Sequence, residues 1–207
     1  MKVWDLATRL YHWFQAVLFI ALIASGFSGN GPHVQLGLAL FTLVLWRILW
    51  GLVGSQTSRF SQFIRSPITV LRYLAGKEPA QPGHNPAGGW MVVTMILTLF
   101  LQCFSGLALA GLLDNMPYME YWLTDTVFSA LESMHYILAR VLPMLILTHV
   151  GAIVVYKLRS KPLVMAMLTG VQSKVTETGE LYFVSQLRAI TVFATAILVT
   201  AAIVVIA

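Results

Sequence analysis

Charged residues and cysteine are scarce in this chain of 207 residues. Lysine and arginine total 13, aspartate and glutamate total 8, and these four types make up 10% of the sequence against 58% hydrophobic residues. The mean hydropathy is +0.79, too high for the surface of a soluble domain, so the composition predicts an integral membrane protein. The one cysteine, Cys103, excludes a disulfide within the chain, a Cys-x-x-Cys motif and a thiolate metal cluster, and we expect it to be a small packing residue.

Five apolar stretches approach or exceed the roughly twenty residues that cross a bilayer as a helix. They cover residues 11–28, 33–53, 90–113, 126–156 and 189–206. Because the chain shows no internal repeat and no long linker, we expect a single domain over residues 1–207 with an all-α fold. Mixed apolar and basic segments at 54–89 and 162–175 predict short amphipathic helices at the membrane surface.

The positive charges flank these spans on one side. They precede the first span and occupy the second and fourth connections: Lys2, Arg9, Arg59, Arg65, Arg72, Lys77, Lys157, Arg159, Lys161, Lys174 and Arg188. The positive-inside rule therefore predicts a cytoplasmic N-terminus and a periplasmic C-terminus. The opposite loop carries acidic residues instead, namely Asp114, Glu120, Asp125 and Glu132. The net charge of +5 is a topology signal, and these scattered cations predict no nucleic-acid partner.

Two histidines share one face of the fourth predicted span. His135 and His149 are fourteen residues apart, which is within roughly 40° of four full helical turns and about 21 Å along the axis. The topology places His33 at the outer level with His135, and His12 at the inner level with His149. Such side chains are costly in an apolar helix unless each meets a metal or a hydrogen-bond partner.

Facing pairs of imidazoles across a helix bundle are typical of b-type haem, which they bind through both axial positions. The spacing therefore predicts two bis-histidine haems b, with His12 and His149 on the inner iron and His33 and His135 on the outer iron. The fold expected is a four-helix haem-binding core plus a fifth transmembrane helix. His84 lies in a loop without a partner at its level, so we expect a loop or capping residue.

Three arginines are candidate partners for the haem propionates. Arg47 follows His33 by fourteen residues and projects from the same face at the inner level, and Arg9 precedes His12 by one turn. Both could serve the inner haem, although Arg9 could also be a topological anchor. Arg140 could serve the outer haem, since a charge inside an apolar span needs a partner.

Several motifs together resemble the prokaryotic cytochrome b561 family. They are Val3-Trp4-Asp5 through Arg9-Leu10-Tyr11-His12-Trp13, His33-Val34-Gln35-Leu36-Gly37, Arg47-Ile48-Leu49-Trp50-Gly51 and the histidines of the fourth span. The resemblance covers roughly residues 1 to 170. Gly83-His84-Asn85-Pro86 also resembles the similar b-type cytochrome subunits of nickel-iron hydrogenases. Some family members have a further histidine where this chain has Tyr156.

The resemblance implies a bundle around two haems b in the bacterial inner membrane, with His12, His33, His135 and His149 at the ligand positions. It implies electron transfer between the membrane quinone pool and a periplasmic redox partner. The acidic outer loop favours a lysine-rimmed cytochrome c as that partner. Membrane lipid surrounds the spans.

Three alternative functions remain open from the sequence. The first is a cytochrome b subunit of a hydrogenase or related dehydrogenase, which the fifth span at 189–206 disfavours, since the hydrogenase subunits end after the fourth. The second is a haem-free membrane anchor or transporter with a histidine proton relay. The third is an enzymatic role as a quinone-linked oxidoreductase, including removal of superoxide at the outer haem.

Overall fold

Five long helices dominate the molecule. The structure, a computed structural model, describes residues 1–79, 81–172 and 180–207. The helices long and apolar enough to cross a membrane are α1 (Leu6–Ser28), α2 (His33–Val53), α5 (Pro86–Leu109), α7 (Asp125–Leu158) and α9 (Gln186–Ile206). The predicted all-α membrane bundle is therefore confirmed, and each predicted span corresponds to one of these helices.

Polar caps and turns set the helix ends, which differ from the predicted ends. Helix α1 begins earlier than predicted because Asp5 Oδ1 accepts a hydrogen bond from the Thr8 amide at 2.6 Å. Asn85 caps α5 in the same way, with a proline in the first turn. Helix α5 ends at Leu109, four residues before the predicted end, because the chain turns at Gly111 with φ of +72°.

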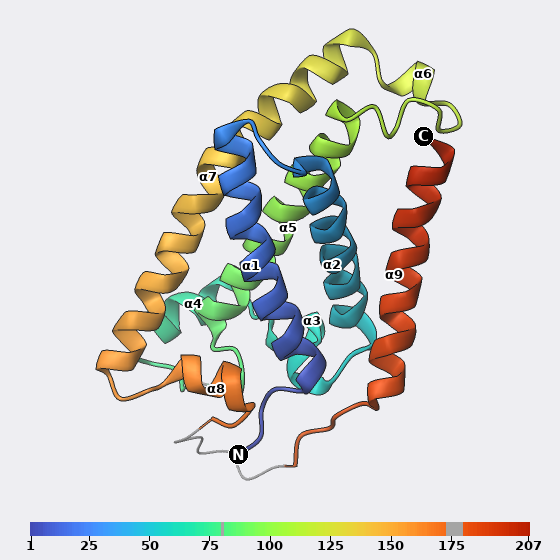
Figure 1. The fold of residues 1–207 in the computed structure, drawn as a ribbon. Helices are drawn as coiled ribbons and strands as arrows, with labels where there is room; N and C mark the ends of the chain where they lie inside the picture. Colours follow the sequence, from blue (N-terminus) through green and yellow to red (C-terminus); the bar gives the residue numbers. More distant parts are fainter. Residues whose placement is uncertain (80, 173–179) are drawn as a thin grey trace.

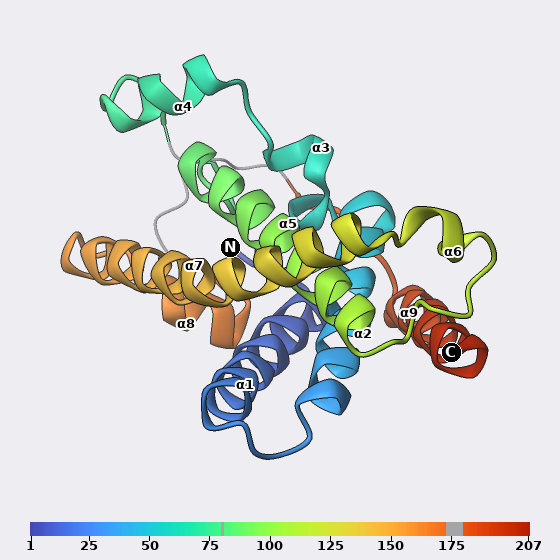
Figure 2. The same cartoon turned by 90° about the horizontal axis from the view of Figure 1, so that it is seen from above.

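Helices α1 and α2 form an antiparallel hairpin, α5 packs against α2, and α7 packs against α5 (Figure 1). Helix α7 is tilted relative to the others and crosses the bundle when seen from above (Figure 2). Its 34 residues exceed what a perpendicular span needs. Helix α9 packs on α2 at the edge of the bundle, where Thr42 Oγ1 and Thr200 Oγ1 lie 2.8 Å apart. The core lies mainly between α2 and α5, around Val44 and Leu99.

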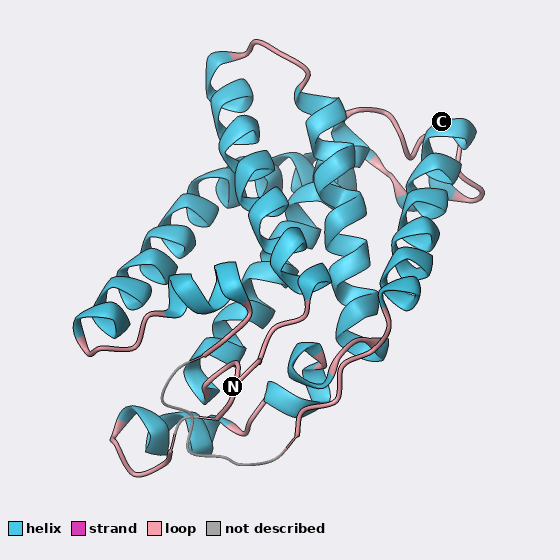
Figure 3. Cartoon of the chain, turned by 60° about the horizontal axis from the view of Figure 1, so that its bottom comes forward, coloured by secondary structure: helices cyan, strands magenta, loops and turns pink. Residues whose placement is uncertain are grey.

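The N-terminus and most short helices lie at one end of the bundle (Figure 3). We call it the basic end, because its connections contain Arg59, Arg65 and Arg72. The short helices there are η1 (Gln56–Ser58), α3 (Phe60–Phe63), α4 (Pro67–Leu74) and α8 (Leu163–Thr169). The backbone amides of Val3 and Trp4 both donate to the carbonyl of Gly170, at 2.8 and 3.1 Å, which joins the N-terminus to the end of α8. The C-terminus and α6 (Met119–Trp122) lie at the opposite end, the acidic end (Figure 1).

The two segments predicted as amphipathic helices do contain helices, α4 and α8. Helix α4 exposes Ile68, Leu71 and Leu74 at 64–67%. An apolar face this exposed suits the membrane surface, and its position there stays a prediction. The last three residues of the predicted 162–175 segment, including Lys174, lie outside the described residues.

Candidate functional site

The four histidines of the predicted spans come together as two pairs. The ring centres of His12 on α1 and His149 on α7 are 6.4 Å apart. The ring centres of His33 on α2 and His135 on α7 are also 6.4 Å apart. Both pairs match the predicted partners, and they sit at two levels of the bundle because α7 contributes to each.

These distances suit a single metal ion between two imidazoles. A metal–imidazole bond is about 2 Å long and the ligating nitrogen lies about 1 Å from the ring centre, so two ligands on opposite sides of one metal place their ring centres about 6 Å apart. The two observed separations of 6.4 Å agree with that value. The backbone therefore already holds each pair at the spacing that axial ligation requires.

The donor set also fits a macrocyclic cofactor. Within the described residues no group of three or more His, Cys, Asp or Glu side chains could hold a metal ion. A bare transition metal usually takes four or more ligands, whereas haem iron already has four from its porphyrin and needs two more. A pair of histidines between helices matches the second requirement.

Serine hydroxyls contact both outer histidines. Ser25 Oγ lies 3.0 Å from His33 Nδ1, and Ser105 Oγ lies 3.0 Å from His135 Nδ1. Each hydroxyl donates its proton to a carbonyl one turn earlier in its own helix, at 3.2 Å for Ser25 and 3.0 Å for Ser105. A histidine whose Nε2 binds a metal carries its proton on Nδ1, and in that tautomer each serine oxygen accepts from Nδ1–H.

Gln102 on α5 is a further neighbour of the outer pair. Its side-chain nitrogen lies 3.1 Å from His135 Nε2, and its backbone carbonyl oxygen lies 3.1 Å from His135 Nδ1. The amide donates to the same Nε2 lone pair that would bind iron. Gln102 Oε1 is buried and has no hydrogen-bond partner in the described part of the chain. Metal binding at His135 therefore requires this amide to move aside.

Unpartnered polar atoms gather along α1 beside the inner pair. Arg9 Nε, His12 Nδ1 and Gln15 Oε1 are buried, and none has a hydrogen-bond partner among the described residues. They are three residues apart, so they follow one another along neighbouring turns of the helix. Buried polar atoms normally have partners, so this stretch of α1 is suited to a polar group that is not part of the chain.

The arginines predicted as propionate partners occupy three different environments. Arg47 is buried, donates to the Ser58 carbonyl at 3.2 Å, and lies over the Phe60 ring. Arg9 is half-buried and donates through Nη1 to the Leu168 carbonyl, which joins α1 to α8. Arg140 is exposed on α7. Their roles toward propionates stay predictions. In the structure Arg47 joins α2 to the end of η1, and Arg9 joins α1 to α8.

His84 belongs to neither pair and lies between aromatic rings at the basic end. Its ring centre is 4.6 Å from those of Trp4 and Phe63. Burial lowers the pKa of His84 to about 3, and the positive charge of Arg47 acts in the same direction. Its Nδ1 is buried without a hydrogen-bond partner among the described residues. The predicted capping role belongs instead to its neighbour Asn85.

Tyr156, at the position where some family members have a histidine, joins three helices. Its hydroxyl lies 2.7 Å from the Tyr73 hydroxyl on α4 and accepts from Asn85 Nδ2 at 3.0 Å. Burial and this hydrogen bond raise the pKa of Tyr73. Tyr156 thus has a structural role at the basic end.

The sequence interpretation missed Ser25 and Ser105. Both are buried polar residues close to the C-terminal ends of their helices, α1 and α5. One signal was present: each is followed by glycine, so the same Ser-Gly pair occurs in the first and third spans. Their contacts with His33 and His135 link different helices and could not be inferred from spacing along one helix.

The sequence profile described as prokaryotic cytochrome b561 matches residues 3–170. No curated protein and no solved structure matches the chain. The matched residues include all four paired histidines and the helices α1, α2, α5 and α7, whereas α9 lies beyond them. A match over this much of the chain, together with two histidine pairs at ligand spacing, shows that the chain belongs to the prokaryotic cytochrome b561 family.

Proposed function

We propose that this membrane b-type cytochrome is a di-haem protein that carries electrons between the quinone pool and a periplasmic redox partner. The observation that carries the proposal is the presence of two histidine pairs, each with ring centres 6.4 Å apart. Membership of the family supports b-type haem and electron transfer. The number of haems and their ligands are inferred here from the geometry.

Each pair draws its two imidazoles from different helices. Haem b held in this way supplies a one-electron couple at an iron that has no open coordination position. His135 and His149 are about 21 Å apart along α7, so the two sites lie at different depths of a hydrocarbon core about 30 Å thick. Packing of the helices fixes both depths, and the chain thereby provides two relay points across the bilayer.

We infer that the basic end faces the cytoplasm and that the C-terminus lies in the periplasm. The connections at the basic end contain the arginines and lysines of the described loops, including Arg59, Arg65 and Arg72, and this supports the orientation. The family supports a quinone as the membrane-soluble partner. The acidic end is then the face available to a periplasmic protein.

Haem content of the purified protein tests the proposal. The wild type should contain two haems b per chain by pyridine haemochrome. His12→Ala and His149→Ala should lose the same haem, and His33→Ala and His135→Ala should lose the other, as seen in reduced-minus-oxidised spectra. His84→Gln is the matched control and should retain both haems, because the His84 ring packs between Trp4 and Phe63 and is a member of neither pair.

One haem per chain in the wild type would show that only one histidine pair binds iron. Loss of the same haem from His12→Ala and His33→Ala would show that the pairs are assigned wrongly. Absence of haem from protein purified in mild detergent would contradict the proposed electron-transfer function.

A further inference from the structure

We propose that Ser25-Gly26 and Ser105-Gly106 are two copies of one device, a Ser-Gly clamp, which positions the outer ligands and lowers the reduction potential of the outer haem. In each clamp the serine holds the imidazole by hydrogen bonding and the glycine leaves room for the ring. The inference rests on the proposed function, because it takes His33 and His135 as haem ligands.

The serine of each clamp orients a histidine that belongs to the next long helix. Ser25 on α1 contacts His33 on α2, and Ser105 on α5 contacts His135 on α7, both at 3.0 Å. Both serines are buried, and Ser105 is fully inaccessible to solvent. With Nε2 on the metal the histidine proton is on Nδ1, so each serine oxygen accepts it while the serine donates its own proton to a backbone carbonyl, and this bond directs Nε2 to the metal.

The glycine of each clamp lies directly against the same imidazole. A Cβ atom at Gly26 would be 3.1 Å from His33 Cε1, and a Cβ atom at Gly106 would be 3.0 Å from His135 Cε1. These contacts are tighter than ordinary van der Waals contact, so a methyl group there would require the ring to shift by a few tenths of an ångström. The same dipeptide thus makes the same two contacts in both helix pairs.

The inner pair has no such arrangement. His12 Nδ1 is buried and has no hydrogen-bond partner among the described residues. A ligand that donates a hydrogen bond from Nδ1 is a stronger electron donor to its metal than one that does not, and a stronger donor favours the oxidised iron. The clamps therefore make the outer haem harder to reduce than the same haem would be without them.

The two clamps differ in one respect, which allows an internal comparison. His135 Nδ1 also lies 3.1 Å from the Gln102 carbonyl, so it keeps an acceptor when the Ser105 hydroxyl is removed. Among the described residues His33 Nδ1 has the Ser25 hydroxyl as its hydrogen-bond partner. Removal of the Ser25 hydroxyl should therefore have the larger effect.

Potentiometric titration of the purified, haem-loaded protein measures this effect. In Ser25→Ala the ratio of reduced to oxidised outer haem at the wild-type midpoint should rise about tenfold, which is about 59 mV for a one-electron couple. Ser105→Ala should change the ratio in the same direction but less. Ser25→Thr, which keeps a hydroxyl, should restore most of the wild-type value. Ser28→Ala, an exposed serine one turn later on α1, is the matched control and should leave the potential unchanged.

The glycine is tested separately by haem content and by the low-temperature EPR signal of the outer iron. Gly26→Ala and Gly106→Ala should shift the signal and lower occupancy of the outer site. Gly151→Ala on α7 is the matched control, because a Cβ atom there meets nothing within 4 Å and two residues along a helix place it on a different face from His149. This control should retain the wild-type signal of the outer iron.

The outcomes separate the clamp from the proposed function. Two haems per chain, with His33→Ala and His135→Ala removing the outer one but Ser25→Ala leaving its potential unchanged, would overturn the clamp alone. A lower potential in Ser25→Ala would also overturn it, since the sign would be wrong. Absence of an outer haem from the wild type would instead remove the proposed function.

Discussion

The five histidines of the chain occupy three kinds of surroundings. His33 and His135 face serine hydroxyls from neighbouring helices, whereas His12, which is paired with His149, has a buried Nδ1 without a partner among the described residues. His84 lies between aromatic rings outside the long helices. The sequence could predict the pairs because helical spacing and topology fix which ring levels coincide. It could not predict the surroundings, which come from contacts between residues distant in the chain.

His84 makes stability depend on pH in a predictable direction. Burial lowers its pKa from 6.5 to about 3, and besides Arg47 the nearby His149 and His12 oppose its protonation. The unfolded chain takes up a proton below pH 6.5, whereas the folded chain keeps His84 neutral until about pH 3. This contribution to stability is thus complete above pH 6.5 and is lost as the pH falls toward 3. At pH 5 the loss should be about 1–2 kcal/mol relative to pH 7.5.

His84→Gln removes this titration, since glutamine stays neutral. Thermal unfolding in detergent at pH 7.5 and pH 5 should show a smaller loss of stability for His84→Gln than for the wild type. Equal losses in the two proteins would show that His84 is accessible to protons in the folded state. The comparison is a difference between two proteins, so the other histidines contribute equally to both.

At the scale of the element, the sequence predicted the spans well but several of their ends poorly. Long apolar runs fix where a helix crosses a membrane, because each unpaired backbone group in lipid is costly. The ends depend on single capping residues, and Asp5 and Asn85 extend α1 and α5 beyond the apolar runs. A polar residue next to a span can cap the helix or belong to the loop. Only its hydrogen bonds show which of the two it does, and the sequence does not reveal them.

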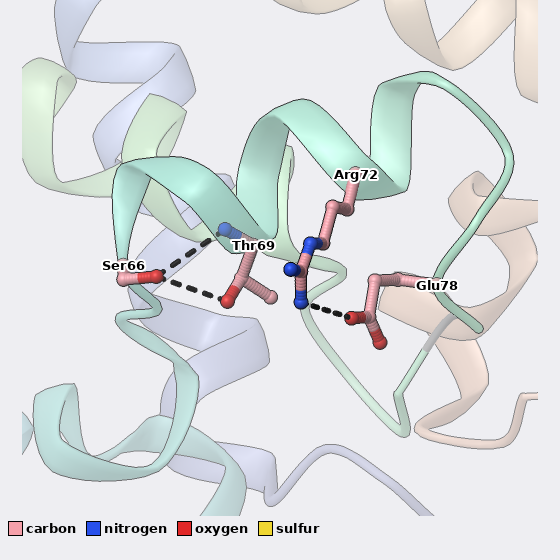
Figure 4. A network of polar contacts seen from close by, with 4 residues as sticks. All are labelled: Ser66, Thr69, Arg72 and Glu78. Atoms are coloured by element: carbon pink, nitrogen blue, oxygen red, sulfur yellow. Dashed lines mark hydrogen bonds and ion pairs between the residues drawn. The ribbon is translucent and has the colours of Figure 1, made fainter.

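Two capping residues of very different burial allow a matched test. Asp5 is 3% exposed, accepts from the Thr8 amide, and lies in a buried network in which Ser58 Oγ is 3.4 Å from its Oδ2. Ser66 caps the exposed helix α4 through the Thr69 amide at 3.2 Å, as Figure 4 shows.

Asp5→Ala should therefore cost about 2–3 kcal/mol of unfolding free energy, because it leaves the buried Thr8 amide and the Ser58 hydroxyl without their acceptor. Ser66→Ala should cost about 1 kcal/mol or less, the usual value of an exposed cap. Asp5→Asn keeps an acceptor for the Thr8 amide and should fall between the two. Chemical denaturation in detergent measures all three, and a cost for Asp5→Ala no greater than for Ser66→Ala would contradict this account.

At the scale of the whole molecule, charge separates the two ends. Within the described residues the one ion pair is Arg72 with Glu78 at 3.9 Å, which joins α4 to the segment that follows it (Figure 4). The four acidic residues of the α5–α7 connection and the start of α7 are exposed: Asp114, Glu120, Asp125 and Glu132. Sequence position alone predicted this separation, because connections alternate between the two sides of a membrane. Whether the acidic end serves as a docking face depends on the charge of the partner.

A cationic redox partner should bind the acidic end. Neutralising the four acidic residues together, as Asp114→Asn, Glu120→Gln, Asp125→Asn and Glu132→Gln, should lower the rate of electron exchange with a lysine-rimmed cytochrome c about tenfold at low salt. High salt should reduce the difference, because it screens exposed charges. Glu180→Gln is the control, because Glu180 is exposed near Tyr182, whose carbonyl accepts from the Gln56 amide at the basic end.

The orientation of the chain decides whether that encounter can occur in a cell. A reporter enzyme that is active only outside the cytoplasm should be active when fused after Ala207 and inactive when fused within the 59–77 connection. The opposite pattern would place the acidic end in the cytoplasm and exclude a periplasmic partner. An unchanged exchange rate in the neutralised variant, with the orientation as proposed, would instead show that the partner docks on another surface. The two measurements together distinguish a wrong topology from a wrong docking face.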